Sequence, residues 1–536
     1  MSAPFRGFAE VADGILQARG TLAKRRWVAE YLKSLDDVDL PIACHYLAGS
    51  PFPRNEDRTL NVGGATIKQA ILALSDWDEQ IYAWVHRVEG DSGSTAQKLV
   101  RNPDDAPGMS LQDMQAALEE LAVLRGQKKL PLIREILGRL TPLEVKYAVK
   151  LMAGSMRIGL QMGLLEAGVA QAFGAKLEEV RHANMLSGDI GRVALAARRG
   201  ELGGVALSLF QPLHFMLAEP LQEGALPPAG EWLVEDKFDG IRVQAHVAGG
   251  RVTLFSRTLD EVTGQFPELI PDLASLPGRW IIDGEAVGWK DGAVLHFNQL
   301  QTRLGRKAVS QQLLGEVPIA FIPYDCLYYG DQLLFHQPLH ERQALLGTLP
   351  RRPRIVPSQV RPLGDPTRIE ALFQEARARG NEGLMLKERN SLYHPGKRGK
   401  QWLKVKRAFA SFDVVITAAE IGHGKRSGVL SDYTFAVRDG DQLVNIGKAY
   451  SGLTDVEIAE LTRILQRITV QRYGRVRLVE PRVVLEVACD GIQVSKRHKS
   501  GFALRFPRIL RWRTDKRPEE IDTLEVVRAA YEASLR

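Results

Sequence analysis

Residues 235–242, EDKFDGIR, join two predicted strands and carry the most specific chemical pattern in the chain. A free lysine amine titrates near ~10.4 and is a poor nucleophile until desolvation or neighbouring cations lower its pKa. Lys237 at a strand end, with Arg242 and a divalent ion close by, would meet those conditions, and Gly240 would permit a tight turn between the two cations. The pattern predicts covalent catalysis by Lys237, and the competing interpretation is a strand that ends in a solvated, charged hairpin.

The segments around this octapeptide alternate apolar and polar residues with a period of two. WLVEDK, IRVQAHV and VTLFSR are typical of successive strands, with Gly249 and Gly250 in a hairpin turn. WIIDGEAVGW and IAFIPYDCLYY indicate further strands, and helical stretches at residues 339–346 and 368–379 alternate with them. From about residue 232 the sequence therefore predicts an α+β domain.

The first ~200 residues have the apolar spacing of helices. The segment TPLEVKYAVKLMAG shows this best, because Thr141 and Glu144 form a capping box, Pro142 fits the first turn and Gly154 ends the helix. Segments at residues 111–125, 163–173, 177–186 and 190–199 repeat the spacing. This region is expected to be one all-α domain.

A third region begins near Phe412. The segments DVVITAAE, YTFAVRDG, QLVNIGKA and RVVLEVACD read as short strands separated by glycine turns, and one helix is predicted at the capping box formed by Thr454 and Glu457. About five short strands with one helix are typical of a small OB-type barrel, a fold that commonly binds nucleic acid.

Composition narrows the class of protein. The chain has 536 residues, of which 45% are hydrophobic and 25% charged, as in soluble multidomain proteins. No apolar run approaches the ~18 residues that span a bilayer, and Glu10 and Asp13 interrupt the start, so an intracellular, cytoplasmic location is expected. Cys44, Cys326 and Cys489 are expected to be buried and reduced, and three cysteines cannot form a four-cysteine zinc site.

Basic residues gather in two blocks, although the formal net charge is only +7. Residues 389–407 contain no acid, and residues 496–517 contain only Asp515. Such runs are often just solvated faces. Their interleaving with aromatic residues such as Trp402 and Phe506 favours a surface for polyphosphate or nucleic acid.

Further motifs follow the octapeptide in a fixed order. They are LFSRTLDEVT with Arg257, IIDGEAVGW with Glu285, IPYDCLYY with Tyr324 and Asp325, EGLMLK with Glu382 and Lys387, KRGKQWLKVKR with Arg398, Lys404 and Lys406, and ALRFPRILRWRTDK with Arg513, Asp515 and Lys516. In this order the motifs resemble those of the ATP-dependent DNA ligases, a branch of the covalent nucleotidyltransferases. The resemblance implies an all-α DNA-binding domain (residues 1–205), an α+β nucleotidyltransferase or ATP-grasp-like adenylation domain (206–409) and a C-terminal OB-fold β-barrel (410–536).

The resemblance also implies a role for each motif in sealing nicks in duplex DNA. Lys237 would attack the α-phosphate of ATP and carry AMP, Glu235 would accept a hydrogen bond from the adenine amino group, and Tyr324 would stack on the ring. Phosphate and ribose contacts would come from Arg242, Arg257, Arg398, Lys404 and Lys406. Glu285 and Glu382 would hold the ribose and a divalent ion, Mg²⁺ or Mn²⁺, because hard cations prefer carboxylate oxygens.

Two further expectations concern motion and DNA. In ligases the motif that here contains Arg513, Asp515 and Lys516 closes over ATP and then swings away, with a hinge expected at residues 407–412. In the N-terminal region, HYLAGSPFPRNEDRTLNVGG looks like a family segment, and SMRIGL, residues 155–160, resembles the stretch that lies on the DNA backbone, with Arg157 as phosphate contact. The alternative for Arg157 is an exposed arginine on an ordinary capped helix. The family arrangement implies a monomer that encircles nicked duplex DNA and serves replication, repair or recombination.

Other functions share parts of this pattern. An RNA ligase or an mRNA capping enzyme of the same superfamily would use the same lysine, and a non-catalytic DNA-binding clamp would need only the basic blocks. The helical N-terminal region and the ending RWRTDK favour a DNA ligase, and the cysteine count disfavours an NAD-dependent one. His336 and His340 are not expected to bind zinc, because Pro338 separates them and no third ligand is near in sequence.

Overall fold

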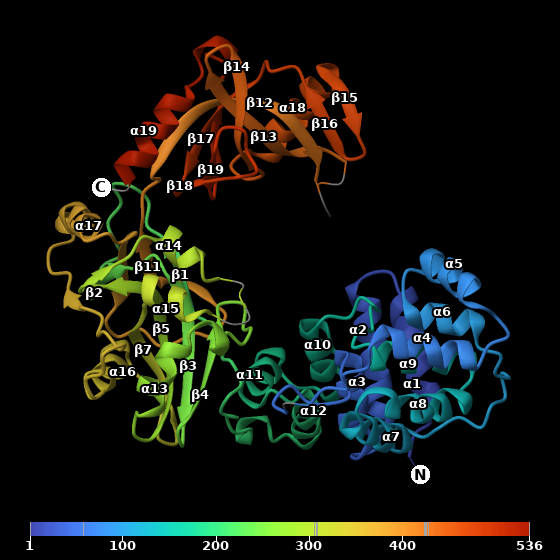
Figure 1. Ribbon diagram of the computed structural model, residues 1–536. Helices are drawn as coiled ribbons and strands as arrows, with labels where there is room; N and C mark the ends of the chain where they lie inside the picture. The colour runs from blue at the N-terminus through green and yellow to red at the C-terminus, as the bar shows by residue number, and fades with distance from the viewer. Residues whose placement is uncertain are drawn as a thin grey trace. The chain divides into compact units, whose positions relative to one another are not determined.

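The computed structural model describes residues 2–56, 58–304, 306, 309–422, 426 and 428–534 (Figure 1). The chain divides into two compact units, Met1–His214 and Phe215–Arg536. Among the residues described, the helices lack the combination of length and apolar character that crossing a membrane requires.

The first unit is built from helices, which occupy the blue to green end of the colour scale in Figure 1. They are α1 (Phe5–Gln17), α2 (Thr21–Ser34), α3 (Asp39–Ala48), α4 (Gly64–Ala73), α5 (Glu79–Glu89), α6 (Ser92–Leu99), α7 (Leu111–Val123), α8 (Lys129–Gly138), α9 (Pro142–Met152), α10 (Met162–Phe173), α11 (Leu177–Ser187) and α12 (Ile190–Arg199). The helix predicted from the capping box is confirmed as α9, where the Thr141 hydroxyl and the Glu144 carboxylate cap each other's backbone. One continuous hydrophobic core joins these helices.

The second unit begins with two sheets, and the predicted hairpin at Gly249 and Gly250 connects two strands of the larger one. The larger sheet contains β3 (Ile241–Ala248), β4 (Arg251–Ser256), β5 (Arg279–Lys290), β6 (Ala293–Val294), β7 (Ile319–Tyr329) and β8 (Gln332–Leu333). The smaller sheet has the order β1-β11-β10-β2-β9, with β1 (Leu217–Pro220), β2 (Trp232–Lys237), β9 (Arg361–Pro362), β10 (Gly383–Glu388) and β11 (Arg398–Val405).

Short helices accompany the two sheets. They are α13 (Ile270–Ala274), α14 (Phe297–Gln301), α15 (Gln311–Glu316), α16 (Leu339–Leu346) and α17 (Ile369–Ala378). The α+β pattern predicted from the sequence is thus present, and α16 and α17 match the two predicted helical stretches. Each sheet has its own hydrophobic core, and α17 packs into the core of the smaller sheet through Leu372 and Phe373.

The C-terminal part holds a curled sheet, a separate pair of strands formed by β18 and β19, and two helices. The elements are β12 (Ala410–Ile421), β13 (Leu430–Asp439), β14 (Gln442–Ala449), α18 (Asp455–Arg467), β15 (Thr469–Tyr473), β16 (Val476–Val479), β17 (Val484–Cys489), β18 (Gly491–Val494), β19 (Phe502–Arg505), β20 (Arg508–Trp512) and α19 (Leu524–Ser534). The prediction of one helix and about five strands was wrong here. The helix α19 was missed, although Leu524 and Val527 are buried in the core of this sheet and Ala530 and Tyr531 pack against it, a helical spacing that the sequence does contain.

Candidate nucleotide-binding site

Lys237 ends β2 and lies beside Glu382, the residue that precedes β10. The two strands run antiparallel with Lys237 opposite Gly383, and the Glu382 N–H donates to the Lys237 carbonyl oxygen at 2.8 Å. The Glu382 carboxylate forms an ion pair with Lys237 Nζ and a second one, at 3.3 Å, with Lys406 Nζ. A pair of neighbouring strands therefore fixes the amine against a carboxylate, and the Lys237 side chain remains 23% exposed.

Glu235 and Lys387 form a second ion pair, which is almost completely buried. The Lys387 Nζ lies 4.3 Å from the centre of the Tyr324 ring and 4.5 Å from that of Trp402. The Ser358 hydroxyl donates to the Glu235 carboxylate at 3.1 Å. This part of the site offers an acceptor, a donor and aromatic faces, the features that recognise the edge and face of a purine base.

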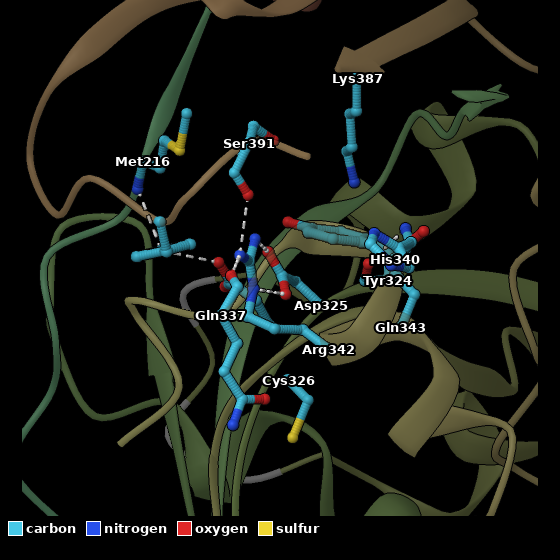
Figure 2. Close-up of polar contacts among 12 residues, drawn as sticks. Met216, Tyr324, Asp325, Cys326, Gln337, His340, Arg342, Gln343, Lys387 and Ser391 are labelled. Carbon is cyan, nitrogen blue, oxygen red and sulfur yellow. Dashed lines mark hydrogen bonds and ion pairs between the residues drawn. The ribbon is translucent and has the colours of Figure 1, made fainter. Parts of the chain in front are cut away.

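Tyr324 is followed in β7 by Asp325, which forms an ion pair with Arg342 of α16 (Figure 2). Arg342 donates from Nε and Nη2 to the two Asp325 oxygens at 2.8 and 2.9 Å, and both side chains are fully buried. Arg342 also donates to the Ser391 carbonyl oxygen, and Gln343 donates to that of Tyr324. Because removing one partner of a buried pair costs about 3–5 kcal/mol, this cluster fixes the backbone that carries Tyr324.

Arg242 lines the same pocket, but its guanidinium has a protein partner. Its Nη2 lies 2.7 Å from a carboxylate oxygen of Asp283, which is fully buried, and its Nη1 donates to the Met216 carbonyl oxygen. Burial raises the pKa of Asp283, and the Arg242 charge partly offsets this effect. The phosphate and ribose contacts expected of Arg242 therefore stay a prediction.

Gly240 was expected to permit a tight turn, but the structure gives a different reason for a glycine at this position. Gly240 is not one of the glycines with a positive φ, so no left-handed turn requires it. A Cβ atom at this position would instead lie 2.6 Å from the Ala286 carbonyl oxygen and 2.7 Å from Glu285 Cγ. Glycine is needed here because the chain after Lys237 passes close to β5.

Glu285 and Glu382 are the two carboxylates expected to hold a divalent ion, and both line the pocket. Burial raises the pKa of Glu285 to about 7, while Lys237 and Arg242 act in the opposite direction and Glu382 adds to the rise. For Glu382, burial raises the pKa, but Lys237 and Lys406 lower it below the ordinary value. Within the described residues no group of three or more His, Cys, Asp or Glu residues could hold a metal. Two carboxylates suit Mg²⁺, which commonly completes its coordination with water and phosphate oxygens.

These residues surround a single cavity of about 910 Å³. It brings together ten of the predicted site residues, namely Glu235, Lys237, Arg242, Arg257, Glu285, Tyr324, Glu382, Arg398, Lys404 and Lys406. Burial lowers the pKa of Lys404, and the nearby charges of Lys406 and Arg398 lower it further. Such crowding of cations favours a polyanionic ligand.

The chain matches three family models in succession. They are described as DNA ligase N terminus (residues 4–170), ATP dependent DNA ligase domain (215–406) and ATP dependent DNA ligase C terminal region (426–516). The chain belongs to the ATP-dependent DNA ligases. Proteins of this family seal nicks in DNA through an adenylate intermediate, and this ligase has their three-domain architecture.

Individual relatives support the same assignment. A protein of Koribacter versatilis named "Probable DNA ligase" is 42% identical, with 98% of this chain and 96% of the relative covered. A DNA ligase of Methanothrix thermoacetophila is 35% identical, with 98% of each chain covered. A solved structure described as Pmar-Lig_PreS3 shares the fold, with a TM-score of 0.52 at 17% identity, over 94% of this chain and 99% of that one.

Arg513 and Lys516 of the ligase are not among the described residues that line the cavity. Arg513 Nη1 lies 2.9 Å and Lys516 Nζ 2.5 Å from the carboxylate oxygens of Asp413, and Arg513 also pairs with Asp515. Hydrogen bonds from Arg513 lower the pKa of Asp515 to about 2. In this structure the two cations are thus held by carboxylates of the C-terminal part.

Arg157 lies in the first unit, in the connection between α9 and α10, and its side chain is exposed. Its φ is +47°, so it does not belong to a helix, and the alternative of a capped helix is wrong at this position. Met156 and Ile158 on either side are buried, and Lys24 Nζ donates to the Ile158 carbonyl oxygen at 3.0 Å. The loop is therefore anchored with Arg157 directed to solvent.

Some pocket residues received no role from the sequence. Lys387 ends the motif EGLMLK, but its ion pair with Glu235 is seen only in the structure. Arg505 donates to both oxygens of Asp239, at 3.0 and 3.2 Å, and these residues belong to the last and first motifs. Their opposite charges were visible in the sequence, but a pairing across 266 positions was not.

Proposed function

We propose that Lys237 is the nucleophile of the ligase and carries AMP. Its Nζ would attack the α-phosphorus of ATP, the bond to the β-phosphate would break, pyrophosphate would leave, and the lysine would lose its proton. The observation that carries the proposal is that Lys237, paired with Glu382, lines the same cavity as Glu235 and Tyr324. An amine held in this way meets the requirement for positioning in phosphoryl transfer.

The remaining pocket residues would divide the nucleotide among them. Glu235 would accept from the adenine amino group while Tyr324 stacks on the ring, which is supported by their common place in the cavity lining, where Lys387 contacts both. Arg242, Arg257, Arg398, Lys404 and Lys406 would contact phosphates and ribose. For Arg242 this role requires that phosphate share its guanidinium with Asp283.

Glu285 and Glu382 would hold Mg²⁺ or Mn²⁺ and help to orient the ribose. When bound, the ion would neutralise charge on the phosphates. The raised pKa of Glu285, to which Glu382 contributes, supports a cation site between the two carboxylates. Before a cation arrives, Lys237 and Lys406 neutralise Glu382.

The later steps would use nicked duplex DNA with a 5′-phosphate and a 3′-hydroxyl. The 5′-phosphate would displace Lys237 from AMP, and the 3′-hydroxyl would then attack that phosphorus and release AMP. Residues 1–205 would act as the helical DNA-binding domain with Arg157 as one phosphate contact, residues 206–409 as the adenylation domain and residues 410–536 as the OB-fold domain. The curled sheet formed by β12 to β17 and β20 supports the last assignment.

Arg513 and Lys516 would serve only the first step, by aligning pyrophosphate when the C-terminal part closes over ATP. Residues 407–412, which comprise the end of the connection from β11 and the first three residues of β12, would act as the hinge. This role requires both cations to leave Asp413.

The test is incubation with ATP labelled at the α-phosphate, followed by mapping of the adduct and by sealing of a nicked duplex. Lys237→Ala is expected to remove label and sealing by more than about 10³-fold without loss of folding, because the proposed attacking amine is lost, although Lys406 still pairs with Glu382. Lys290→Ala, an exposed lysine at the end of β5, is the matched control and should behave as wild type. Label on another residue, or labelling by GTP with sealing of RNA instead of DNA, would refute the proposal.

A further inference from the structure

Asp236 lies between Glu235 and Lys237 in β2 and also lines the cavity, but its carboxylate has different partners. Successive side chains of a strand point to opposite faces, so Asp236 is directed away from its neighbours. Its carboxylate accepts two hydrogen bonds from Arg379, from Nη2 at 2.7 Å and from Nε at 2.9 Å. It also accepts one from the side-chain amide of Asn381 at 2.8 Å.

These partners belong to the short connection from α17 to β10. Arg379 is the residue that follows α17, and Gly380, with a φ of +81°, makes the turn. Asn381 is 3% exposed, and its backbone N–H donates to Ala376 of α17 at 3.0 Å. The Asn381 Oδ1 atom is buried without a hydrogen-bond partner in the described structure, so the amide gains its side-chain hydrogen bond through Asp236.

The residue after Asn381 is Glu382, the partner of Lys237. We propose that Asp236 is a positioning residue for adenylation of Lys237, because it holds the α17–β10 connection and thereby keeps Glu382 against the lysine. The inference rests on the proposed function, since it concerns the same nucleophile. Asp236 touches neither reacting atom, and its effect passes through Asn381 and the backbone of Glu382, which donates to the Lys237 carbonyl oxygen.

An ordinary surface ion pair is the competing explanation, because the Arg379 side chain is 45% exposed. Such pairs contribute about 0–1 kcal/mol to stability. A pair of this kind would not change the rate of adenylation at Lys237. The two explanations differ in their consequence for Lys237. If Asp236 only stabilises the fold, its loss lowers the Tm slightly and changes neither the adenylation rate nor the acylation of Lys237.

The test compares Asp236→Ala, Asp236→Asn and wild type. Single-turnover formation of the Lys237–AMP adduct is followed over a range of ATP concentrations. Asp236→Ala is expected to lower the maximal rate about tenfold and to change the KM for ATP less than about threefold, because displacement of a reacting group costs rate rather than base binding. Asp236→Asn keeps an oxygen acceptor and should recover most of the rate.

A second readout needs no ATP. Acylation of Lys237 by an amine-reactive reagent, quantified by mass spectrometry, should rise severalfold in Asp236→Ala because the pairing with Glu382 loosens. Asp331→Ala is the matched control, since it breaks the exposed pair with Arg279 in the same part of the chain. Because acylation is independent of adenylation, it tests Asp236 even if another residue carried AMP.

Two results would overturn the inference. One is an adenylation rate within twofold of wild type together with unchanged acylation of Lys237. The other is a loss of rate that follows a fall in Tm, is not recovered by Asp236→Asn and leaves the acylation of Lys237 unchanged.

Discussion

The cations of the nucleotide pocket and those of the C-terminal motif are both paired with carboxylates, but in different settings. In the pocket, Lys237 and Lys406 share Glu382 at the wall of a cavity of about 910 Å³. In the C-terminal motif, Arg513 and Lys516 share Asp413 away from the lining of that cavity. Pairing in the pocket keeps two cations on the wall of the cavity, whereas pairing with Asp413 keeps Arg513 and Lys516 off its described lining. Under the proposed function, Arg513 and Lys516 would have to leave Asp413 before they could contact ATP.

The largest effect that tests this difference is expected from Arg513→Ala or Lys516→Ala. Either change should slow self-adenylation about 10²-fold, because a cation that stabilises the departing pyrophosphate is lost. Sealing of a nick whose 5′-phosphate is already adenylated should stay within about threefold of wild type, because no pyrophosphate leaves in that step. Both rates are measured by gel assay in single turnover.

Arg511→Ala is the control for these two variants. Arg511 lies in β20 close to Arg513 in sequence, but it is exposed and pairs with Glu486. It should affect neither step. If Arg513→Ala slowed self-adenylation and the sealing of pre-adenylated DNA equally, the C-terminal motif would serve both steps, and the proposed difference from the pocket would be refuted.

A smaller effect is expected from Glu285→Gln on stability against pH. Burial raises the folded-state pKa of Glu285 to about 7, above the value of about 4.5 in the unfolded chain. The native protein therefore binds more protons than the unfolded chain between these values, and the wild type loses stability as pH rises from about 5 to about 7. The loss is on the order of a few kcal/mol and should be absent in Glu285→Gln.

Thermal unfolding between pH 5 and pH 8, without ATP and with a chelator present, measures this difference. Glu341→Gln, an exposed carboxylate at the start of α16, is the control and should follow the wild type. Parallel curves for wild type and Glu285→Gln would show that the pocket carboxylate is as well solvated as a surface one.

The smallest effect is expected from Arg157→Ala. Like Arg513 and Lys516, Arg157 is a cation that is not among the described residues lining the pocket. Nick affinity should fall about threefold to tenfold, and the slope of log K against log salt should become shallower by about one, because one phosphate contact is lost. Self-adenylation should not change. Arg134→Ala on α8 is the control, and an equal effect of both variants would show a diffuse charge rather than one contact.

The sequence predicted which residues line the pocket better than it predicted the side-chain pairings among them. Strand alternation and ordered motifs were sufficient to bring Glu235, Lys237 and Glu382 to one cavity, because adjacent strands leave little freedom in where their side chains go. The pairing of Arg242 with Asp283 was not foreseen, since either carboxylate of the motif around Glu285 was an equally good partner in sequence. Contacts between distant residues depend on packing that no local pattern records.

The same limit explains other differences. Asp236 and Arg379 are far apart in sequence, and both look like ordinary surface charges until the pairing of β2 with β10 brings the connection after α17 to Asp236. Conversely, the helix α9 was predicted in detail because its capping box is a local pattern of four residues. The sequence left Arg157 between the helix that ends at Gly154 and the helical segment predicted from residue 163, but the positive φ of Arg157 has no sequence signature.

The three cysteines are all buried, and each belongs to a different hydrophobic core: Cys44 to that of the first unit, Cys326 to that of the larger sheet and Cys489 to that of the C-terminal sheet. Burial raises the pKa of each thiol, that of Cys489 to about 11. A thiol reagent can therefore react only when the surrounding core opens. The native protein thus carries one built-in reporter in each of three cores, whereas the core of the smaller sheet contains none, and the order in which the cysteines become modified in denaturant gives the order in which those three cores unfold.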